Sequence, residues 1–215
     1  MKIIAINGSP RKNWNTATLL KKALEGAASK GAETELINLY DLKYSGCISC
    51  FACKRKDGEH GKCAVKDDLT PILEKLKTVD AIVFGSPIYY MNITARMGAF
   101  LERFLFSNSI YSFEIPTVYP KKIKSGFIYT MGATEKQFDE MGIEAGLKPY
   151  QNTIMRTLGN PLELLYSYDA YQFTDYEKYE SSMFLEKEKA KHKDKQFPID
   201  CQKAFNIGAA LVIND

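Results

Sequence analysis

The sequence lacks the patterns that mark several common classes of protein. No apolar run approaches the roughly 20 residues of a membrane-spanning helix. The formal net charge is only +3, and the lysines are interleaved with acidic residues, so no basic stripe for nucleic acid is present. The sequence contains neither G-x-x-x-x-G-K followed by Ser or Thr nor G-x-G-x-x-G, which argues against a P-loop NTPase and a Rossmann dinucleotide site. We therefore expect no membrane and no nucleic-acid partner.

The first residues do not predict a secretory leader. The apolar part of MKIIAING is far too short for a signal-peptide core. A cytoplasmic location is therefore expected, in which thiols stay reduced. Hydrophobic residues make up 45% and charged residues 26% of the 215 residues, which are ordinary values for a globular protein. A single domain over residues 1–215 is expected.

Alternating strand and helix patterns predict a doubly wound α/β sheet. Strands are predicted at Lys2–Asn7, Glu33–Leu39, Ala81–Gly85, Ser125–Thr130 and Leu162–Tyr168. Helices are predicted at Thr16–Ser29, Leu69–Thr78, Ala95–Phe106 and Glu135–Leu158, the last interrupted near Lys148-Pro149. Asn15 and Asp68 are the expected N-caps of the first two helices.

Two segments do not fit this repeat. A cysteine-rich insertion covers about residues 44–66, between the second strand and its helix. A highly charged, Tyr-rich segment covers about residues 174–196. Its composition predicts a solvated helix or a mobile excursion before the last helix.

The loop NGSPRKNWNTATLL, Asn7–Leu20, follows the first predicted strand and opens the first predicted helix. This position binds anions in α/β sheets, because free backbone N–H groups and the positive helix end face the ligand. Hydroxyls and amides without a P-loop lysine suit a terminal monophosphate held by neutral donors. The alternative is an ordinary helix-capping turn rich in Asn, Ser and Thr.

Three stretches at three strand ends, GSPRKNWNTATLL, GSPIYYMNITARMGAFLERF and TMGAT, together resemble the NADPH-dependent FMN reductase family of the flavodoxin-like superfamily. The resemblance covers residues 1–135 well and the remainder in outline. It implies a flavodoxin-like, five-stranded parallel sheet of order 2-1-3-4-5 with helices on both faces. It also implies FMN as the bound cofactor and NAD(P)H as the electron donor.

The resemblance assigns roles to three loops. The FMN phosphate would be held by Ser9, Arg11, Asn15 and Thr16. The isoalloxazine edge would be lined by Pro87, Ile88, Tyr89, Tyr90, Met91 and Asn92, and the pocket would be closed by Thr130, Met131 and Gly132. Trp14 stands where such loops usually have glycine. The aromatic second loop independently suits a flat apolar ring, although Tyr89 and Tyr90 would equally suit a core or an interface.

Four of the five cysteines, Cys47, Cys50, Cys53 and Cys63, lie within seventeen residues. Their spacing, Cys-x₂-Cys-x₂-Cys-x₉-Cys, begins like the compact run that holds iron–sulfur clusters. Iron–sulfur flavoproteins resemble this family and carry a similar motif, usually with a shorter final gap.

Three readings of the cysteines stay open: a [4Fe–4S] cluster, cluster-free reduced thiols, and structural zinc with His60 as a further candidate ligand. The long polar gap before Cys63 favours cluster-free thiols. Two native disulfides are not expected. The fifth cysteine, Cys201 in the last helix, is expected to be a small buried hydrophobe.

The leading functional hypothesis is an FMN-dependent oxidoreductase that passes electrons from NAD(P)H to a small acceptor, such as a quinone, a nitro compound or free flavin. No side chain is expected to be catalytic, because the flavin carries the chemistry. One alternative is an electron carrier of the iron–sulfur flavoprotein type, and another is a zinc-binding structural module. The apolar continuation LFSNSIYSF after the third helix predicts a homodimer or homotetramer.

Overall fold

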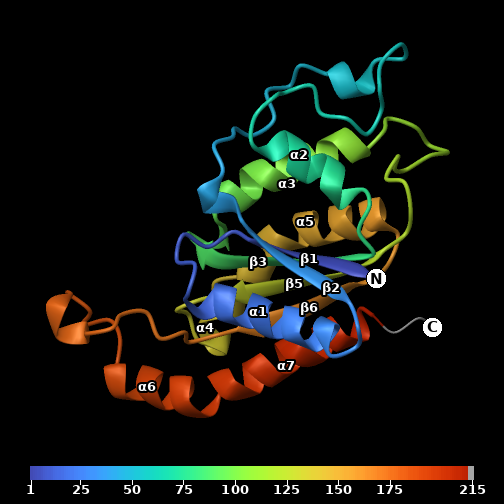
Figure 1. Cartoon of the computed structure of the whole chain (residues 1–215). Helices are drawn as coiled ribbons and strands as arrows, with labels where there is room; N and C mark the ends of the chain where they lie inside the picture. The colour runs from blue at the N-terminus through green and yellow to red at the C-terminus, as the bar shows by residue number, and fades with distance from the viewer. Residues whose placement is uncertain (213–215) are drawn as a thin grey trace.

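The computed structural model describes residues 1–212, and its centre is a twisted parallel β-sheet (Figure 1). The strands are β1 (Lys2–Asn7), β2 (Glu33–Asn38), β3 (Ala81–Tyr89), β4 (Asn92–Ile93), β5 (Lys124–Thr130) and β6 (Leu162–Ser167). The parallel strands follow the order β2-β1-β3-β5-β6. When the short hairpin strand β4 is set aside, this is the expected order 2-1-3-4-5, so the flavodoxin-like fold is confirmed.

Helices cover both faces of the sheet. They are α1 (Asn15–Ala28), α2 (Leu69–Leu76), α3 (Ala95–Asn108), α4 (Glu135–Glu140), α5 (Ile143–Leu158), α6 (Glu186–Lys195) and α7 (Phe197–Ala210). Short 3₁₀ turns occur at Leu39–Asp41, Ala52–Lys54 and Tyr176–Lys178. None of the helices within residues 1–212 combines the length and apolar character that crossing a membrane requires.

Alternate residues of the central strands face two separate hydrophobic cores. Ile4 and Ile6 pack with α2, α3 and α5, whereas Ile3 and Ala5 pack with α1 and α7. Successive side chains of a strand point to opposite faces, so a sheet covered on both sides needs a continuous apolar run. The runs detected in the sequence therefore reflect this two-sided burial.

The α1–α7 contact is close because of two glycines. A Cβ at Gly208 would lie 1.7 Å from the Ala23 carbonyl oxygen, and one at Gly26 would lie 1.9 Å from the Phe205 carbonyl oxygen. Glycine therefore lets the two helix backbones approach directly.

Two details of the helix predictions are wrong. The break in the fourth predicted helix falls at Met141–Gly142, where Gly142 adopts a left-handed φ of +63°, and not at Lys148-Pro149. Pro149 lies inside α5, which continues through the lost N–H group. The N-cap of α1 is Trp14, and Asn15 is the first helical residue.

The two segments outside the repeat extend from the sheet in different directions (Figure 1). The cysteine segment lies beyond the α2–α3 layer, on the outer side of these helices. The charged segment leaves the carboxyl edge of the sheet, forms the Tyr176–Lys178 turn and α6, and returns directly into α7.

Candidate flavin site and cysteine cavity

The start of α1 is left open to an anion. Its N-cap, Trp14, has no side-chain hydrogen bond to the helix, and its first turn has no acidic residue. By contrast, Thr94 caps α3 by accepting from the Met97 N–H, and Thr134 with Gln137 forms a capping box at α4. The first N–H groups of α1 have no partner within the helix, so this end retains its positive character. Its chemistry fits a phosphate.

The loop before α1 is folded by its own polar side chains. The Ser9 N–H donates to Asn7 Oδ1 at 3.0 Å, and the Arg11 N–H donates to Ser9 Oγ at 3.1 Å. Ser9 is buried. These bonds turn the chain sharply at the end of β1 and hold it beside the start of α1.

Buried hydroxyls tie this loop between β1 and α1 to the loops after β3 and β5. Thr16 Oγ1 and Thr130 Oγ1 lie 2.7 Å apart in a hydrogen bond between buried side chains. The Thr94 hydroxyl donates to the Gly8 carbonyl oxygen at 2.7 Å, and the Gly8 N–H donates to the Gly85 carbonyl oxygen at 2.8 Å. The three predicted loops therefore meet at one edge of the sheet.

The second loop is a tight hairpin between β3 and β4. Its two central residues, Tyr90 and Met91, both have positive φ, of 47° and 65°. Such turns normally take Asn or Gly, so these side chains carry backbone strain. Tyr90 is fully exposed, and Tyr89 and Met91 are a little under half exposed. Strained, exposed aromatic residues at a loop tip indicate a binding surface.

A cavity of about 350 Å³ brings the second and third loops together. It is lined by Ile88, Tyr90, Met91, Met131, Gly132, Ala133, Met141 and Ile143. Its walls are almost entirely apolar, as a stacked ring system requires. Thr130 is the last residue of β5 and directly precedes Met131, and Pro87 and Asn92 lie in the flanking strands β3 and β4.

The segment after β6, which the sequence did not place at the site, accepts hydrogen bonds from the loop between β1 and α1. The Tyr171 carbonyl oxygen accepts hydrogen bonds from Trp14 Nε1 at 3.1 Å and from Asn15 Nδ2 at 3.0 Å. The Gln172 carbonyl oxygen accepts from Arg11 Nη1 at 2.6 Å. Arg11 also stacks 3.8 Å above the Trp14 ring. The indole therefore faces the end of β6.

Lys189 of α6 secures the third loop. Only 3% exposed, it donates to the Gly132 carbonyl oxygen at 3.0 Å and to Asp169 Oδ1 at 2.7 Å. Asp169 has a positive φ of 45°, which directs the chain into Tyr171 and Gln172. The sequence carried one signal for the position of this segment, which is the fifth predicted strand. Because parallel strands end at the same edge of the sheet, the chain after that strand must lie near the three predicted loops.

The cysteine segment surrounds a second, smaller cavity. Cys47, Cys50, Cys53 and Cys63 all line it, together with Arg103 of α3. All four thiols are free. Cys53 is 8% exposed, and burial raises the pKa of its thiol. Within residues 1–212, no three His, Cys, Asp or Glu side chains stand close enough together to hold a metal ion.

Arg103 joins both ends of this segment to α3. Its Nη1 donates to Asp67 Oδ2 at 2.5 Å and to the Ser45 carbonyl oxygen at 3.3 Å, and its Nη2 donates to the Val65 carbonyl oxygen at 3.2 Å. Burial opposes the charged form, but the Asp67 hydrogen bond and the nearby Cys63 thiol raise the pKa of the guanidinium. Nε has no hydrogen-bond partner among the described residues.

A second cation fixes the middle of the segment. Lys54 donates to the carbonyl oxygens of Phe106 and Ser109, at the end of α3, and its ammonium lies 4.2 Å from the Phe106 ring centroid. Burial lowers its pKa. The other named candidates are less enclosed: His60 is exposed and contacts the Arg55 carbonyl oxygen, and Cys201 is half-buried, with burial raising the pKa of its thiol.

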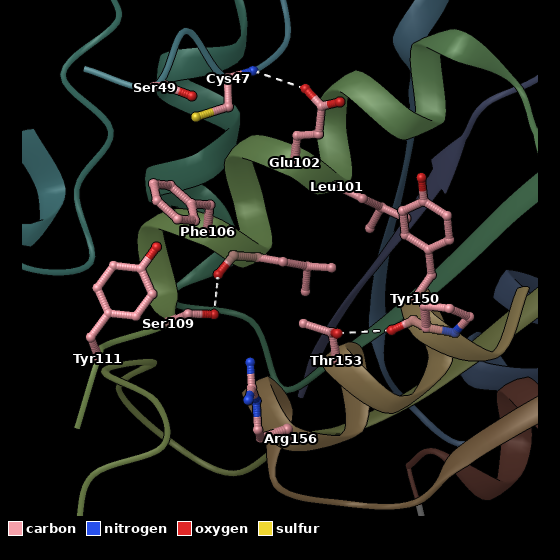
Figure 2. Close-up of a pocket in the computed structure, with 12 residues that line it drawn as sticks. Cys47, Ser49, Leu101, Glu102, Phe106, Ser109, Tyr111, Tyr150, Thr153 and Arg156 are labelled. Atoms are coloured by element: carbon pink, nitrogen blue, oxygen red, sulfur yellow. Dashed lines mark hydrogen bonds between the residues drawn. The ribbon is translucent and has the colours of Figure 1, made fainter. Parts of the chain in front are cut away.

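The largely apolar groove in Figure 2 lies between α3, α5 and the cysteine segment. Cys47 lines this groove as well as the cysteine cavity, and its N–H donates to Glu102 Oε2 at 3.1 Å. Arg156 of α5 lies at the opposite wall (Figure 2). The groove and the cysteine cavity therefore adjoin each other at Cys47.

The sheet topology defines a flavodoxin-like α/β protein, in which the helix that follows β1 begins without a side-chain cap or an acidic residue in its first turn. A model of the NADPH-dependent FMN reductase family matches residues 1–115, and the chain belongs to this family.

Two curated relatives and one solved structure extend the comparison. The chain is 43% identical over 103 residues to an iron–sulfur flavoprotein of Methanocaldococcus jannaschii, covering 48% of this chain and 51% of the relative. It is 41% identical over 103 residues to an iron–sulfur flavoprotein of Archaeoglobus fulgidus, covering 48% of each. These matches thus span about half the length of each relative.

The solved NAD(P)H:quinone oxidoreductase of Methanothermobacter marburgensis has a similar fold. Its TM-score is 0.73 at 16% identity, over 100% of this chain and 98% of that one. At this identity the likeness supports the fold alone.

Proposed function

We propose that this protein is an FMN-dependent oxidoreductase that takes electrons from NAD(P)H and passes them to a small acceptor, such as a quinone, a nitro compound or free flavin. Bound FMN would supply the hydride-accepting ring. Family membership supports the flavin and its nicotinamide donor. The observation that carries the proposal is the uncapped, acid-free start of α1, hydrogen-bonded to the loop beside the apolar cavity.

The residues would share the work as follows. Ser9, Thr16 and the N–H groups at the start of α1 would bind the phosphate, because they are short-range donors at a positive helix end. Arg11 and Asn15 would add charge and a further donor, in exchange for their present contacts with the Tyr171 and Gln172 carbonyl oxygens.

The apolar cavity would hold the ring. Residues 87–92 would line one edge, and Thr130, Met131 and Gly132 the other. Tyr90 and Met91 would exclude water from it, because they stand at the cavity mouth as large, exposed side chains. The chain would thus bind and orient the flavin without a catalytic side chain of its own.

The test is a fluorescence titration of apoprotein with FMN. Changing both Ser9→Ala and Thr16→Ala should weaken FMN binding by a few kcal/mol in total, at about 1–3 kcal/mol for each lost hydrogen bond to a charged acceptor. The same double variant should bind riboflavin, which has no phosphate, almost as well as the unmodified protein does.

Ser29→Ala is the matched control, because Ser29 lies at the other end of α1 and its hydroxyl donates to the Gly26 carbonyl oxygen. It should leave FMN affinity unchanged. Equal FMN affinity in the double variant and the control would refute the phosphate assignment.

A second candidate function is electron transfer through FMN and a [4Fe–4S] cluster held by Cys47, Cys50, Cys53 and Cys63. Two observations favour it: all four thiols line one cavity, and a buried arginine nitrogen there lacks a partner. The donor set and its surroundings therefore fit such a group in their chemistry, although the thiols stand apart. Iron and sulfide analysis of anaerobically purified protein tests it, with about four irons per chain expected.

We also propose that the protein is a homodimer. The segment after α3 exposes Tyr111, Phe113 and Ile115, and Phe51 lies nearby against Phe106. Exposed apolar side chains grouped in this way are typical of an interface. Sedimentation at micromolar concentration should give a dimer that Phe113→Asp dissociates, and a monomeric unmodified protein would refute the assembly.

A further inference from the structure

The side chain of Arg103 is almost completely buried, although one of its nitrogen atoms has no hydrogen-bond partner among the described residues. It is 1% exposed, and its Nε–H is a buried donor without a partner among the described residues. Leaving such a donor unpaired costs about 1–3 kcal/mol, more for a charged group. Native proteins rarely retain such a cost without a ligand, water or ion that removes it.

The guanidinium cannot easily turn to relieve this cost. Its Nη1 and Nη2 are held by Asp67 and by the carbonyl oxygens of Ser45 and Val65, which precede Cys47 and follow Cys63 in the chain. The fork is planar and rigid, so these contacts also fix the direction of Nε. Arg103 lines the same cavity as the four cysteines.

An iron–sulfur cluster in this cavity would be stabilised by such a donor. Four thiolates around an iron–sulfur cube carry net negative charge, and the hydrogen bonds that their sulfurs accept are a main determinant of the cluster's reduction potential. The Asp67 carboxylate already balances part of the arginine's charge. What the guanidinium still offers the cavity is a fixed N–H group.

We propose that Arg103 is a positioning and tuning residue, whose Nε–H donates a hydrogen bond to a sulfur of a [4Fe–4S] cluster held by Cys47, Cys50, Cys53 and Cys63. This inference rests on the second function proposed above. The bond stabilises the reduced, more negative state of the cluster more than the oxidised state, so it raises the reduction potential.

The experiment compares Arg103→Lys with Asp67→Asn in full-length protein reconstituted anaerobically with iron and sulfide. Lysine keeps the charge and a partner for Asp67 but lacks the Nε–H, whereas Asp67→Asn breaks the ion pair and keeps the Nε–H. Redox titration followed by electron paramagnetic resonance should shift Arg103→Lys to lower potential. The oxidised-to-reduced ratio should change about tenfold, or about 59 mV for a one-electron couple. Asp67→Asn should stay unchanged or move upward.

Equal shifts in the two variants, or none in either, would overturn the proposal, because an arginine that acts only through its charge and its pair with Asp67 would not give Arg103→Lys a downward shift that Asp67→Asn lacks. Unmodified protein that takes up no iron would overturn it together with the cluster function, while FMN binding tests the leading function separately.

A spectroscopic readout covers the case in which Arg103→Lys does not fold. Unmodified protein labelled with ¹⁵N-arginine should show a hyperfine coupling between the reduced cluster and an arginine nitrogen. This coupling should persist in Arg55→Lys, whose guanidinium pairs with Asp57 in the exposed part of the segment. Its absence from the unmodified protein would refute the hydrogen bond.

Discussion

Thr16 at the sheet edge and Arg103 beneath the cysteine segment anchor two sets of loops by different chemistry. At the sheet edge, neutral hydroxyls and backbone groups connect loops that each start at the end of a strand, and the buried cation Lys189 adds a contact from α6. Each loop is therefore fixed first by the sheet, and the cross-links only adjust it. Loss of one hydroxyl leaves the remaining connections intact.

The cysteine segment has no strand to start from. It runs outside α2 and α3, and two cations on its inner side, Arg103 and Lys54, hold its ends and its middle. Charged groups make stronger hydrogen bonds than neutral ones, but a buried charge is costly once its partner is lost. The comparison indicates that one substitution here should do more damage than one at the sheet edge.

The largest effect is expected for Arg103→Met. This variant leaves the Asp67 carboxylate and two carbonyl oxygens without their partner, and breaking a buried ion pair costs about 3–5 kcal/mol. Urea unfolding should show a loss of this size, discounted somewhat because Asp67 is partly exposed. Lys22→Ala, which removes an exposed pair with Glu25, should leave stability essentially unchanged. Similar losses of stability in Arg103→Met and Lys22→Ala would show that the buried ion pair contributes no more than an exposed one.

The same contrast explains what the sequence could predict. The convergence of the loop between β1 and α1 with the loops after β3 and β5 was predictable, because the carboxyl ends of parallel strands share one edge. Strand positions were close for the same reason, since apolar runs report two-sided burial. The β4 hairpin was not predicted, because Tyr90 and Met91 are unusual residues for a turn with positive φ.

The burial of Arg103 and Lys189 could not be predicted from the sequence. Arg103 follows Glu102 in a helix whose pattern predicts exposed polar residues, and only the covering cysteine segment buries it. Lys189 lies in a charged run expected to be solvated, and that expectation is wrong for this residue. Both depend on contacts between residues distant in the chain, with Asp67 and with Gly132, which periodicity does not report.

The next largest effect is expected for Lys189→Met, which removes a buried cation at the sheet edge. The variant leaves the Gly132 carbonyl oxygen and the Asp169 carboxylate without their buried cation. We expect about 2 kcal/mol of destabilisation, because Asp169 is partly exposed and keeps some solvation. Calorimetry with and without FMN checks it. Lys191→Met, whose ammonium pairs only with exposed Glu188, is the control and should be neutral.

A smaller effect concerns thiol reactivity in reduced, metal-free protein. Burial raises the pKa of Cys53, so its thiolate fraction at neutral pH is reduced, whereas Cys50 is exposed. Iodoacetamide should modify Cys53 more slowly than Cys50 at pH 7, as measured by mass spectrometry. The Cys53 rate should keep rising above the ordinary thiol pKa, because its own pKa is higher. Equal rates would show that the cavity does not enclose Cys53.

The smallest effect is expected in the β3–β4 hairpin, where the sheet edge stores strain. Tyr90→Gly removes the cost of a left-handed non-glycine residue, about 1–2 kcal/mol, but adds about 0.5–1 kcal/mol of backbone entropy to the unfolded chain. The fully exposed Tyr90 side chain loses little packing. Apoprotein should therefore gain about 0.5–1 kcal/mol in urea unfolding. Tyr89→Gly, at a β3 position paired with Asn92, should lose stability instead.

If the hairpin is strained in order to present Tyr90 to a flavin, Tyr90→Gly should also bind FMN more weakly while being more stable. A variant that gains both stability and FMN affinity would show that the strain serves another purpose.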